Sequence, residues 1–300
     1  EAKWAYTDFG PAGKVTRREH VADLDLTLVT FANGVRLNFK KTAFEANRIR
    51  VVARVGRGML TQPRDQPGLS TLANASFVAG GLGRHSADDL RRILAGKNVS
   101  ASFGAGQDSF SFSGGTTPTD ILLQLQLLTA RITDPGHRPE ALRQARKGIE
   151  EAYLSYAHTL NGPLSLEVSQ LLVSGDFRFG MPPEKDMLAR DLTEVRAWLT
   201  PELTRGRIEV SLVGDLDIDA TIAAVAQTLG ALPPRDAPPL PAELKAVKFP
   251  ATPFAKDYRV ETEIPRGLVR TYWPTTDGID VKRTRRLNLL TSVLSDRLRL

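Results

Sequence analysis

The sequence predicts an α+β layered sandwich, in which helices pack on a mostly antiparallel sheet. Three observations predict this fold. Strand-like runs with a period of two come in groups, and helical runs also come in groups. The two kinds then follow one another as strands, helices, strands, helices, strand and helix. A doubly wound parallel sheet would instead alternate strands and helices one by one.

The first predicted strands form a hairpin at residues 27–43, where two apolar runs are joined through Asn33-Gly34. This dipeptide tolerates positive φ and therefore suits a tight turn. A third strand is predicted at 48–58, because apolar residues there alternate with arginines and small residues. Two further strands, 98–104 and 108–115, follow the first helices.

The first predicted helices span 68–79 and 86–95, and Ser86 with Asp89 three residues later is a plausible N-cap for the second. Longer helical runs at 117–135 and 138–160 each have a proline in the first turn. The remaining elements are a helix pair at 163–174 and 189–199, a buried strand that turns at Gly214-Asp215, and a helix that ends at Gly230.

We expect a first domain at 1–235, a linker at 236–254 and the start of a second domain at 255–300. Residues 232–254 contain seven prolines, a density that prevents regular structure. Beyond them the sequence predicts strands at 258–264 and 267–273 and a helix at 281–300. That helix has no stop signal before Leu300, so we expect the second domain to be truncated.

The composition excludes several classes of protein. The chain has 300 residues, 41% of them apolar, but no run reaches the roughly 18 apolar residues of a membrane span. It contains no cysteine, which excludes disulfides, thiolate metal sites and cysteine nucleophiles. The net charge of +6 comes from interleaved signs, which favours a solvated surface over a nucleic-acid interface. The basic helix at 281–300 likewise lacks interleaved aromatic residues that stack on bases.

Candidate catalytic groups are sparse. The four histidines, His20, His85, His137 and His158, include no pair at helical spacing for zinc, and we expect each at the surface. The sequence has neither a G-x-S-x-G elbow nor a phosphate-binding glycine loop. Glu150-Glu151 lie about 100° apart on a helix, which favours solvated surface over a carboxylate pair.

The order and spacing of five stretches resemble the second half of long bacterial M16 (insulinase or pitrilysin family) zinc peptidases, over essentially the whole chain. The stretches are FANGVRLNFKKT, VGRGML, PGLSTLANASFVAGG, LQLLTARITDPGHRPEALRQARKGI and VSLVGDLDIDATIAAVAQTLGALPPR. The resemblance implies the layered fold of M16-like (LuxS-like) metallohydrolase domains. Residues 1–235 would form one such domain, and 255–300 the truncated start of another.

Active halves of this family carry an H-x-x-E-H zinc motif on the first helix, after G-L-[AS]. Here residues 68–70 match the lead-in, and the motif positions fall on Thr71, Asn74 and Ala75. The family's third ligand, a glutamate on a later helix, falls at Glu150-Glu151, with Glu151 as the candidate. The resemblance therefore implies neither a catalytic residue nor a metal ligand in this chain, and it implies that zinc is held by the other half.

The function implied by the resemblance is that of a non-catalytic, chamber-forming and peptide-binding half of a zinc metalloendopeptidase. Its partners would be a catalytic M16 half, in the same polypeptide or a separate subunit, and a peptide substrate, without nucleic acid or a membrane span. Active halves hold the substrate as an added strand at a sheet edge. The corresponding stretch here is 98–104, with Ser100, Ser102 and Phe103 as candidate contacts.

The family also implies export, for example to a periplasm, although the first residues form no targeting peptide. The alternative is a stand-alone peptide-binding or scaffolding protein without a catalytic partner. A nucleic-acid-binding role is a third hypothesis.

Overall fold

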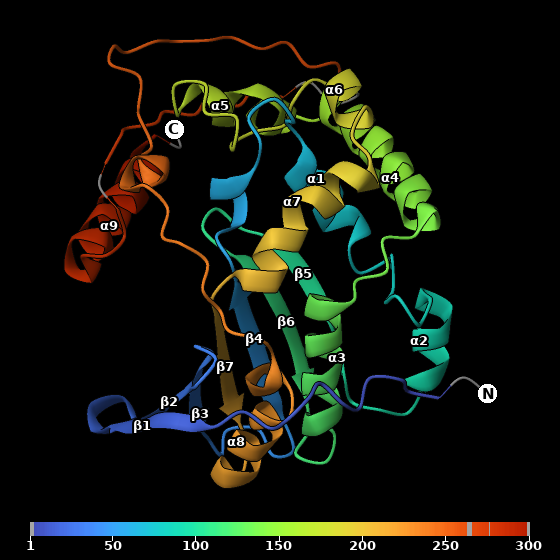
Figure 1. Ribbon diagram of the computed structural model, residues 1–300. Helices are drawn as coiled ribbons and strands as arrows, with labels where there is room; N and C mark the ends of the chain where they lie inside the picture. Colours follow the sequence, from blue (N-terminus) through green and yellow to red (C-terminus); the bar gives the residue numbers. More distant parts are fainter. Residues whose placement is uncertain (1–2, 263–265, 276, 299–300) are drawn as a thin grey trace. The chain divides into compact units, whose positions relative to one another are not determined.

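Seven strands form one sheet in the order β1-β2-β3-β7-β4-β6-β5 (Figure 1). This computed structural model describes residues 3–262, 266–275 and 277–298. The β3–β7 pair is parallel and the other neighbouring strands are antiparallel, so the predicted fold class is confirmed. The strands are β1 Val15–Val21, β2 Leu26–Phe31, β3 Arg36–Lys41, β4 Ile49–Val55, β5 Ser102–Ala105, β6 Phe110–Thr116 and β7 Ile208–Gly214.

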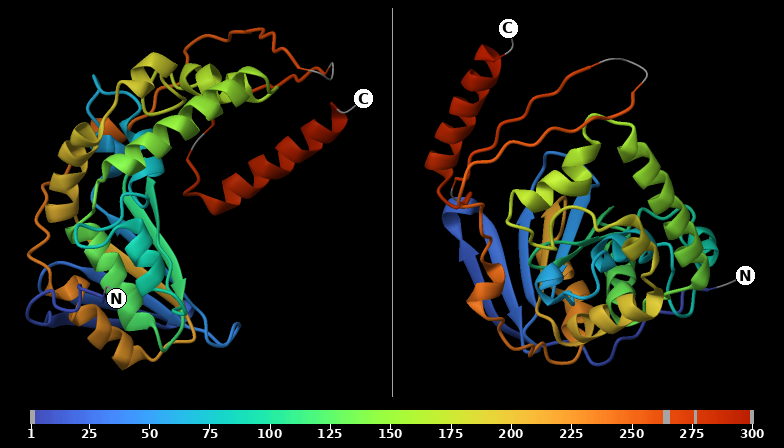
Figure 2. Two further views of the ribbon diagram at one scale, coloured as in Figure 1. Left: turned by 90° about the vertical axis from the view of Figure 1, so that its right-hand side faces the viewer. Right: turned by 90° about the horizontal axis from the view of Figure 1, so that it is seen from above.

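The helices within residues 69–226 lie on one face of the sheet, and Figure 2 shows the same separation in two further views. Along β4, Ile49, Val51, Ala53 and Val55 are buried and the residues between them are exposed. The helices are α1 Leu69–Ser76, α2 Ala87–Ile93, α3 Ile121–Thr133, α4 Pro139–Ala157, α5 Ser169–Leu171, α6 Glu184–Leu188, α7 Leu192–Arg205 and α8 Ile218–Ala226. The core therefore lies between one sheet face and this helical layer.

Two local predictions from the sequence are confirmed in detail. Gly34 turns the β2–β3 hairpin with φ +86°, a conformation that suits glycine. Ser86 caps α2: its hydroxyl accepts from Asp89 N–H, and the Asp89 carboxylate accepts from Ser86 N–H.

Other predictions differ from the structure. Strand β1 and helix α6 were not predicted, because β1 is charged and exposed on both faces and α6 has only five residues. Residues 258–262 and 267–273 form no strand, and the rest of the first predicted strand lies outside the described residues. Two short strand-like segments need a sheet or a helix to pack on before they form a stable ribbon.

The chain divides into two compact units, Glu1–Thr262 and Glu263–Leu300. The proline-rich segment at 236–254 therefore lies within the first unit. Arginine side chains hold it there: Arg57 Nη1 donates to Pro238 O at 2.9 Å, and Arg178 donates to Leu244 O and Ala246 O. Apart from one 3₁₀ turn at Ala242–Lys245, this segment is irregular, as its prolines predict.

The second unit contains helix α9, Val281–Arg297, which begins at the N-cap Asp280. Nothing in the described residues tests whether 255–300 begins a second M16-like domain, so that domain stays a prediction. Across the described part of the chain, no helix combines the length and the apolar character needed to cross a membrane.

Candidate functional site

The three motif positions on α1 come together on its outward face. Leu69, Leu72, Ala73 and Ser76 form the buried side of the helix. Thr71 is half-buried and Asn74 and Ala75 are exposed, on the opposite side. Residues at i, i+3 and i+4 share one helical face, so the sequence spacing alone brings these three side chains together.

One residue of this face, Asn74, reaches β5, the strand at the end of the sheet. The Asn74 side-chain Oδ1 accepts a hydrogen bond from Ala105 N–H at 2.7 Å. One turn further along the chain, the Phe77 ring stacks on Phe103 with 4.1 Å between ring centroids. The position that carries the catalytic glutamate in the resembled motif therefore holds a sheet edge in place.

The outer edge of β5 has backbone groups directed away from the sheet. Among the described residues, strand β5 pairs only with β6, and just beyond it Gly106 N–H donates to Ser109 O in the β5–β6 turn. Alternate residues of an antiparallel strand direct their backbone groups to opposite sides. Ala105 N–H points outward to Asn74, so Phe103, two residues earlier, also directs its N–H and C=O to the open edge.

The three candidate peptide contacts differ in what they offer. The backbone of Ser100 is held by the Gln124 side chain, which accepts from its N–H and donates to its C=O. The Ser102 hydroxyl lies 2.6 Å from the Ser113 hydroxyl. Phe103 packs its ring on α1, so its backbone, and not its side chain, faces the open edge.

Glu151 does not join the motif positions. The buried stripe of α4 is Ala141, Ala145, Ile149 and Tyr153. Glu151 comes two residues after Ile149, about 200° around the helix, where it is exposed and lies 3.9 Å from Lys147 Nζ. Its neighbour Glu150 is exposed as well.

The residues present at α1 do not fit a zinc ion. Zinc in proteins is held by thiolate, imidazole and carboxylate groups, and threonine, asparagine and alanine provide none of them. The Asn74 oxygen is also engaged by Ala105. Within residues 3–262, 266–275 and 277–298, no group of three or more histidine, cysteine, aspartate or glutamate side chains is arranged to hold a metal.

The expectation that all four histidines lie at the surface is wrong for His85. This residue is 5% exposed, because residues 4–6 cover it. Its Nε2 accepts from Ala5 N–H at 3.1 Å, and its ring lies beside those of Trp4 and Tyr6. His137 packs edge-to-face on Phe77, and burial, with a smaller effect of Arg196, lowers its pKa.

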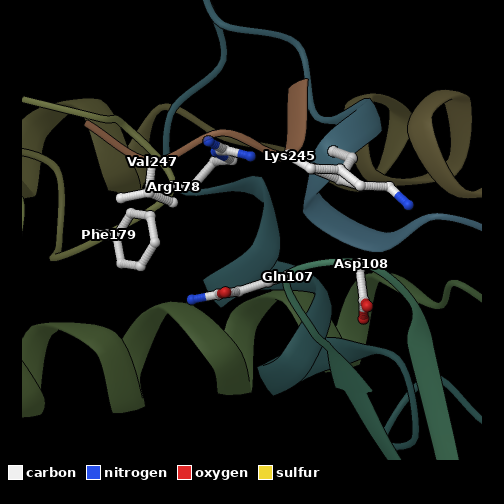
Figure 3. A pocket seen from close by; sticks show the side chains of 7 residues that line it. Gln107, Asp108, Arg178, Phe179, Lys245 and Val247 are labelled. Atoms are coloured by element: carbon white, nitrogen blue, oxygen red, sulfur yellow. The ribbon is translucent and has the colours of Figure 1, made fainter. Parts of the chain in front are cut away.

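A cavity of about 260 Å³ lies beyond the β5–β6 turn (Figure 3). Gln107 and Asp108 of that turn line one side of it, and Arg178, Phe179 and Lys245 line the other. The Arg178 guanidinium already donates to the Asp176 carboxylate and to Leu244 O and Ala246 O. The guanidinium donors of Arg178 are therefore engaged in holding the proline-rich segment. The cavity thus lies where that segment packs on the rest of the first unit, and we assign it no ligand.

Sequence reasoning missed the role of Asn74 as a support for β5. It also gave no role to Arg50 and Arg54, which are exposed on β4. The signal for the two arginines was present, since they alternate with the buried residues of that strand. The Asn74–Ala105 bond joins residues 31 apart in sequence, and no local pattern indicates it.

Comparisons with known proteins agree with this fold. No protein-family model matches the sequence. The chain is 32% identical over 95 residues to the probable zinc protease PqqL of Escherichia coli, which covers 32% of the chain and 10% of that protein. It is 24% identical over 220 residues to the chloroplastic stromal processing peptidase of Arabidopsis thaliana, which covers 70% of the chain and 17% of that protein. The chain thus spans less than a fifth of the length of either relative.

Solved structures show the same architecture. The periplasmic protease PqqL from Escherichia coli superposes with a TM-score of 0.69 and 22% identity, over 83% of this chain and 27% of that one. A peptidase M16 inactive domain from Pseudomonas fluorescens superposes with a TM-score of 0.58 and 19% identity, over 71% of this chain and 52% of that one. At these identities the likeness establishes the fold alone.

Proposed function

We propose that this chain, whose homologues and structural neighbours are M16 peptidases, is the non-catalytic half of a zinc metalloendopeptidase. In this proposal the chain helps to enclose a chamber and binds the peptide, while another half holds zinc and cleaves it. That half is part of the same polypeptide or a separate subunit. The whole protein would be exported, by analogy with the periplasmic PqqL structure.

The observation that carries the proposal is the outward face of α1. Thr71, Asn74 and Ala75 occupy the motif positions and supply no zinc ligand, yet the helix keeps its buried side and its place beside the edge strand. These features support a helix that packs as the motif helix of an active half would, but whose side chains provide no zinc ligand. The M16 inactive domain among the structural neighbours supports the same interpretation.

Peptide binding is proposed at the open edge of β5. Phe103 presents backbone groups there, and Asn74 keeps the end of the strand fixed. An extended peptide that adds to a sheet edge gains backbone hydrogen bonds whatever its sequence. This mode suits a protein that acts on peptides or small unfolded proteins.

The test has two parts. The purified chain should hydrolyse no unstructured peptide, with or without added zinc. It should bind an uncharged peptide of alternating glutamine and threonine, with slower hydrogen exchange at the Phe103 amide. The amides of β1, the other edge strand, serve as the internal control and should not change. Hydrolysis that a zinc chelator abolishes would overturn the non-catalytic assignment.

A stand-alone peptide-binding or scaffolding protein is the second candidate, since the β5 edge serves either role. The coding sequence on both sides of this chain discriminates the two. An upstream H-x-x-E-H motif supports the proposed half-enzyme. A complete gene that lacks such a motif, with no catalytic partner co-purifying, supports the scaffold.

A further inference from the structure

The sheet face opposite the helices carries basic side chains across its central strands. Arg36 and Lys40 lie on β3, and Arg50 and Arg54 lie on β4. On β7, between these strands, the same face has one carboxylate, that of Glu209. On β3, β4 and β7, four cations therefore share this face with a single anion.

The one carboxylate is already engaged within the face. Glu209 is the register partner of both Arg36 and Arg54, and its Oε1 accepts from Asn38 Nδ2 at 2.6 Å. In the part of the chain that the structure describes, no carboxylate lies within ion-pair distance of Arg36, Arg50 or Arg54. These three guanidinium groups are therefore available to an anion from solution.

Beside the arginines, the same face consists of small side chains only, and we call this part of the face the floor. Strands β5 and β6 place only serine and glycine there, at Ser102, Gly104, Ser111, Ser113 and Gly115. Neighbouring strands lie about 5 Å apart, so this floor is wide enough for one extended chain. A segment that lies along β6 runs one strand spacing from the arginines of β4.

The spacing along β4 matches an extended peptide. Arg50 and Arg54 are four residues apart in a strand, which places them about 13 Å apart. Carboxylates at i and i+4 of an extended peptide have the same separation and lie on the same side. The planar arginine fork binds carboxylate with two parallel hydrogen bonds.

We propose that this open face binds acidic, extended segments of the peptide substrate. This inference rests on the proposed function and adds the substrate class to it. The charge of the face and the clear floor favour an acidic peptide. A nucleic acid is disfavoured, because the open-face residues of β3 to β7 include no aromatic side chain on which bases would stack. Val52 and Val213, 40% and 42% exposed, supply apolar contact between the charges.

The experiment compares two fluorescein-labelled peptides by anisotropy, one of alternating glutamate and threonine and one of alternating glutamine and threonine. The acidic peptide should bind more tightly, and its affinity should fall as salt is raised. The double variant Arg50→Gln/Arg54→Gln should bind the acidic peptide about tenfold more weakly and the neutral peptide unchanged. Both residues are exposed, and circular dichroism and thermal unfolding verify that the variant folds.

The matched control is Arg92→Gln/Lys97→Gln, which removes the same charge from exposed positions on and after α2. It should bind both peptides like the wild type. Equal binding of both peptides, or an equal loss in both double variants, would overturn the acidic-substrate inference while leaving the proposed function intact. Failure to bind either peptide would instead contradict the proposed function. Binding of a single-stranded oligonucleotide as tight as that of the acidic peptide would show a general polyanion surface and overturn the inference.

Discussion

Asn74 Oδ1 accepts a hydrogen bond from Ala105 N–H at 2.7 Å, and this bond ties the outward face of α1 to the last residue of the edge strand β5. In the resembled H-x-x-E-H motif, the same position carries the catalytic glutamate. The amide group of asparagine has no negative charge and is a poor general base, but its oxygen is a good acceptor for a backbone N–H. The position thus has a structural use that does not depend on metal chemistry.

The first prediction concerns this bond. Asn74→Ala removes the acceptor of Ala105 N–H and should lower the free energy of unfolding by about 1 kcal/mol, the usual net worth of such a bond. Urea unfolding measures the loss, and the Ala105 amide should exchange faster. Thr71→Ala, on the same helical face and without a hydrogen bond to β5 in the described residues, is the matched control and should cost less than about 0.5 kcal/mol. An equal cost in both variants would contradict the assigned role of Asn74.

The second prediction concerns restoration of the motif. The triple variant Thr71→His/Asn74→Glu/Ala75→His would regain two imidazoles on one face of α1 but not the third ligand, because Glu151 lies on the exposed side of α4. It should bind zinc weakly, since a catalytic site needs three protein ligands, and should hydrolyse no peptide. Zinc titration with a chromophoric chelator and a peptide-cleavage assay measure the two quantities. Tight zinc binding that Glu151→Gln abolishes would show that Glu151 does reach the site.

Local features of this fold can be predicted from the sequence, whereas the packing of distant elements cannot. The Asn33-Gly34 turn and the Ser86–Asp89 capping box follow from local chemistry, and the structure confirms both. The outward face of α1 follows from helical periodicity. By contrast, the phase of α4 relative to α1 depends on how the two helices pack. The resemblance alone indicated Glu151 as a ligand, whereas the exposed positions of Glu150 and Glu151 agree with the solvated surface that their helical spacing favours.

Strand β1 illustrates another limit. Its sequence, VTRREHV, has no alternation of apolar and polar residues, because as an edge strand it is exposed on both faces. Charged residues on an edge strand protect it from pairing with other chains. It forms a strand because it pairs with β2, and that partner is not visible in a local window of sequence.

The third prediction concerns the buried ion pair between Arg57 and Glu202. The Glu202 side chain is 3% exposed and accepts from Arg57 N–H at 2.8 Å as well as from its guanidinium. Glu202→Gln leaves the half-buried guanidinium of Arg57 without its counter-charge and should lower the free energy of unfolding by about 3 kcal/mol. Arg205→Gln breaks the exposed pair with Asp236 and should cost much less, because solvent screens that pair. Urea denaturation of the two variants side by side measures the difference, and similar costs would contradict the burial argument.

The fourth prediction concerns Tyr6, which fastens the segment before β1 to the loop after α3. Its hydroxyl donates to Asp134 Oδ2 at 2.6 Å and accepts from Arg84 N–H at 2.9 Å. Burial, and then the hydrogen bond to Asp134, raise its pKa to about 12. A pKa that is higher in the folded state means that this contribution to stability is complete below pH about 10 and is lost as the pH rises through about 12.

The free energy of unfolding of the wild type should therefore fall between pH 9 and pH 11.5. Most of this pH interval lies between the ordinary tyrosine pKa of about 10 and the raised value of about 12. In Tyr6→Phe this fall should be smaller, although the variant is less stable at pH 9 because Arg84 N–H and Asp134 lose a partner. Tyr153, whose burial also raises its pKa to about 12, keeps its contribution in the variant, so part of the pH dependence should remain. Urea unfolding at both pH values measures the fall, and an undiminished fall in Tyr6→Phe would contradict the assigned role of the Tyr6–Asp134 bond.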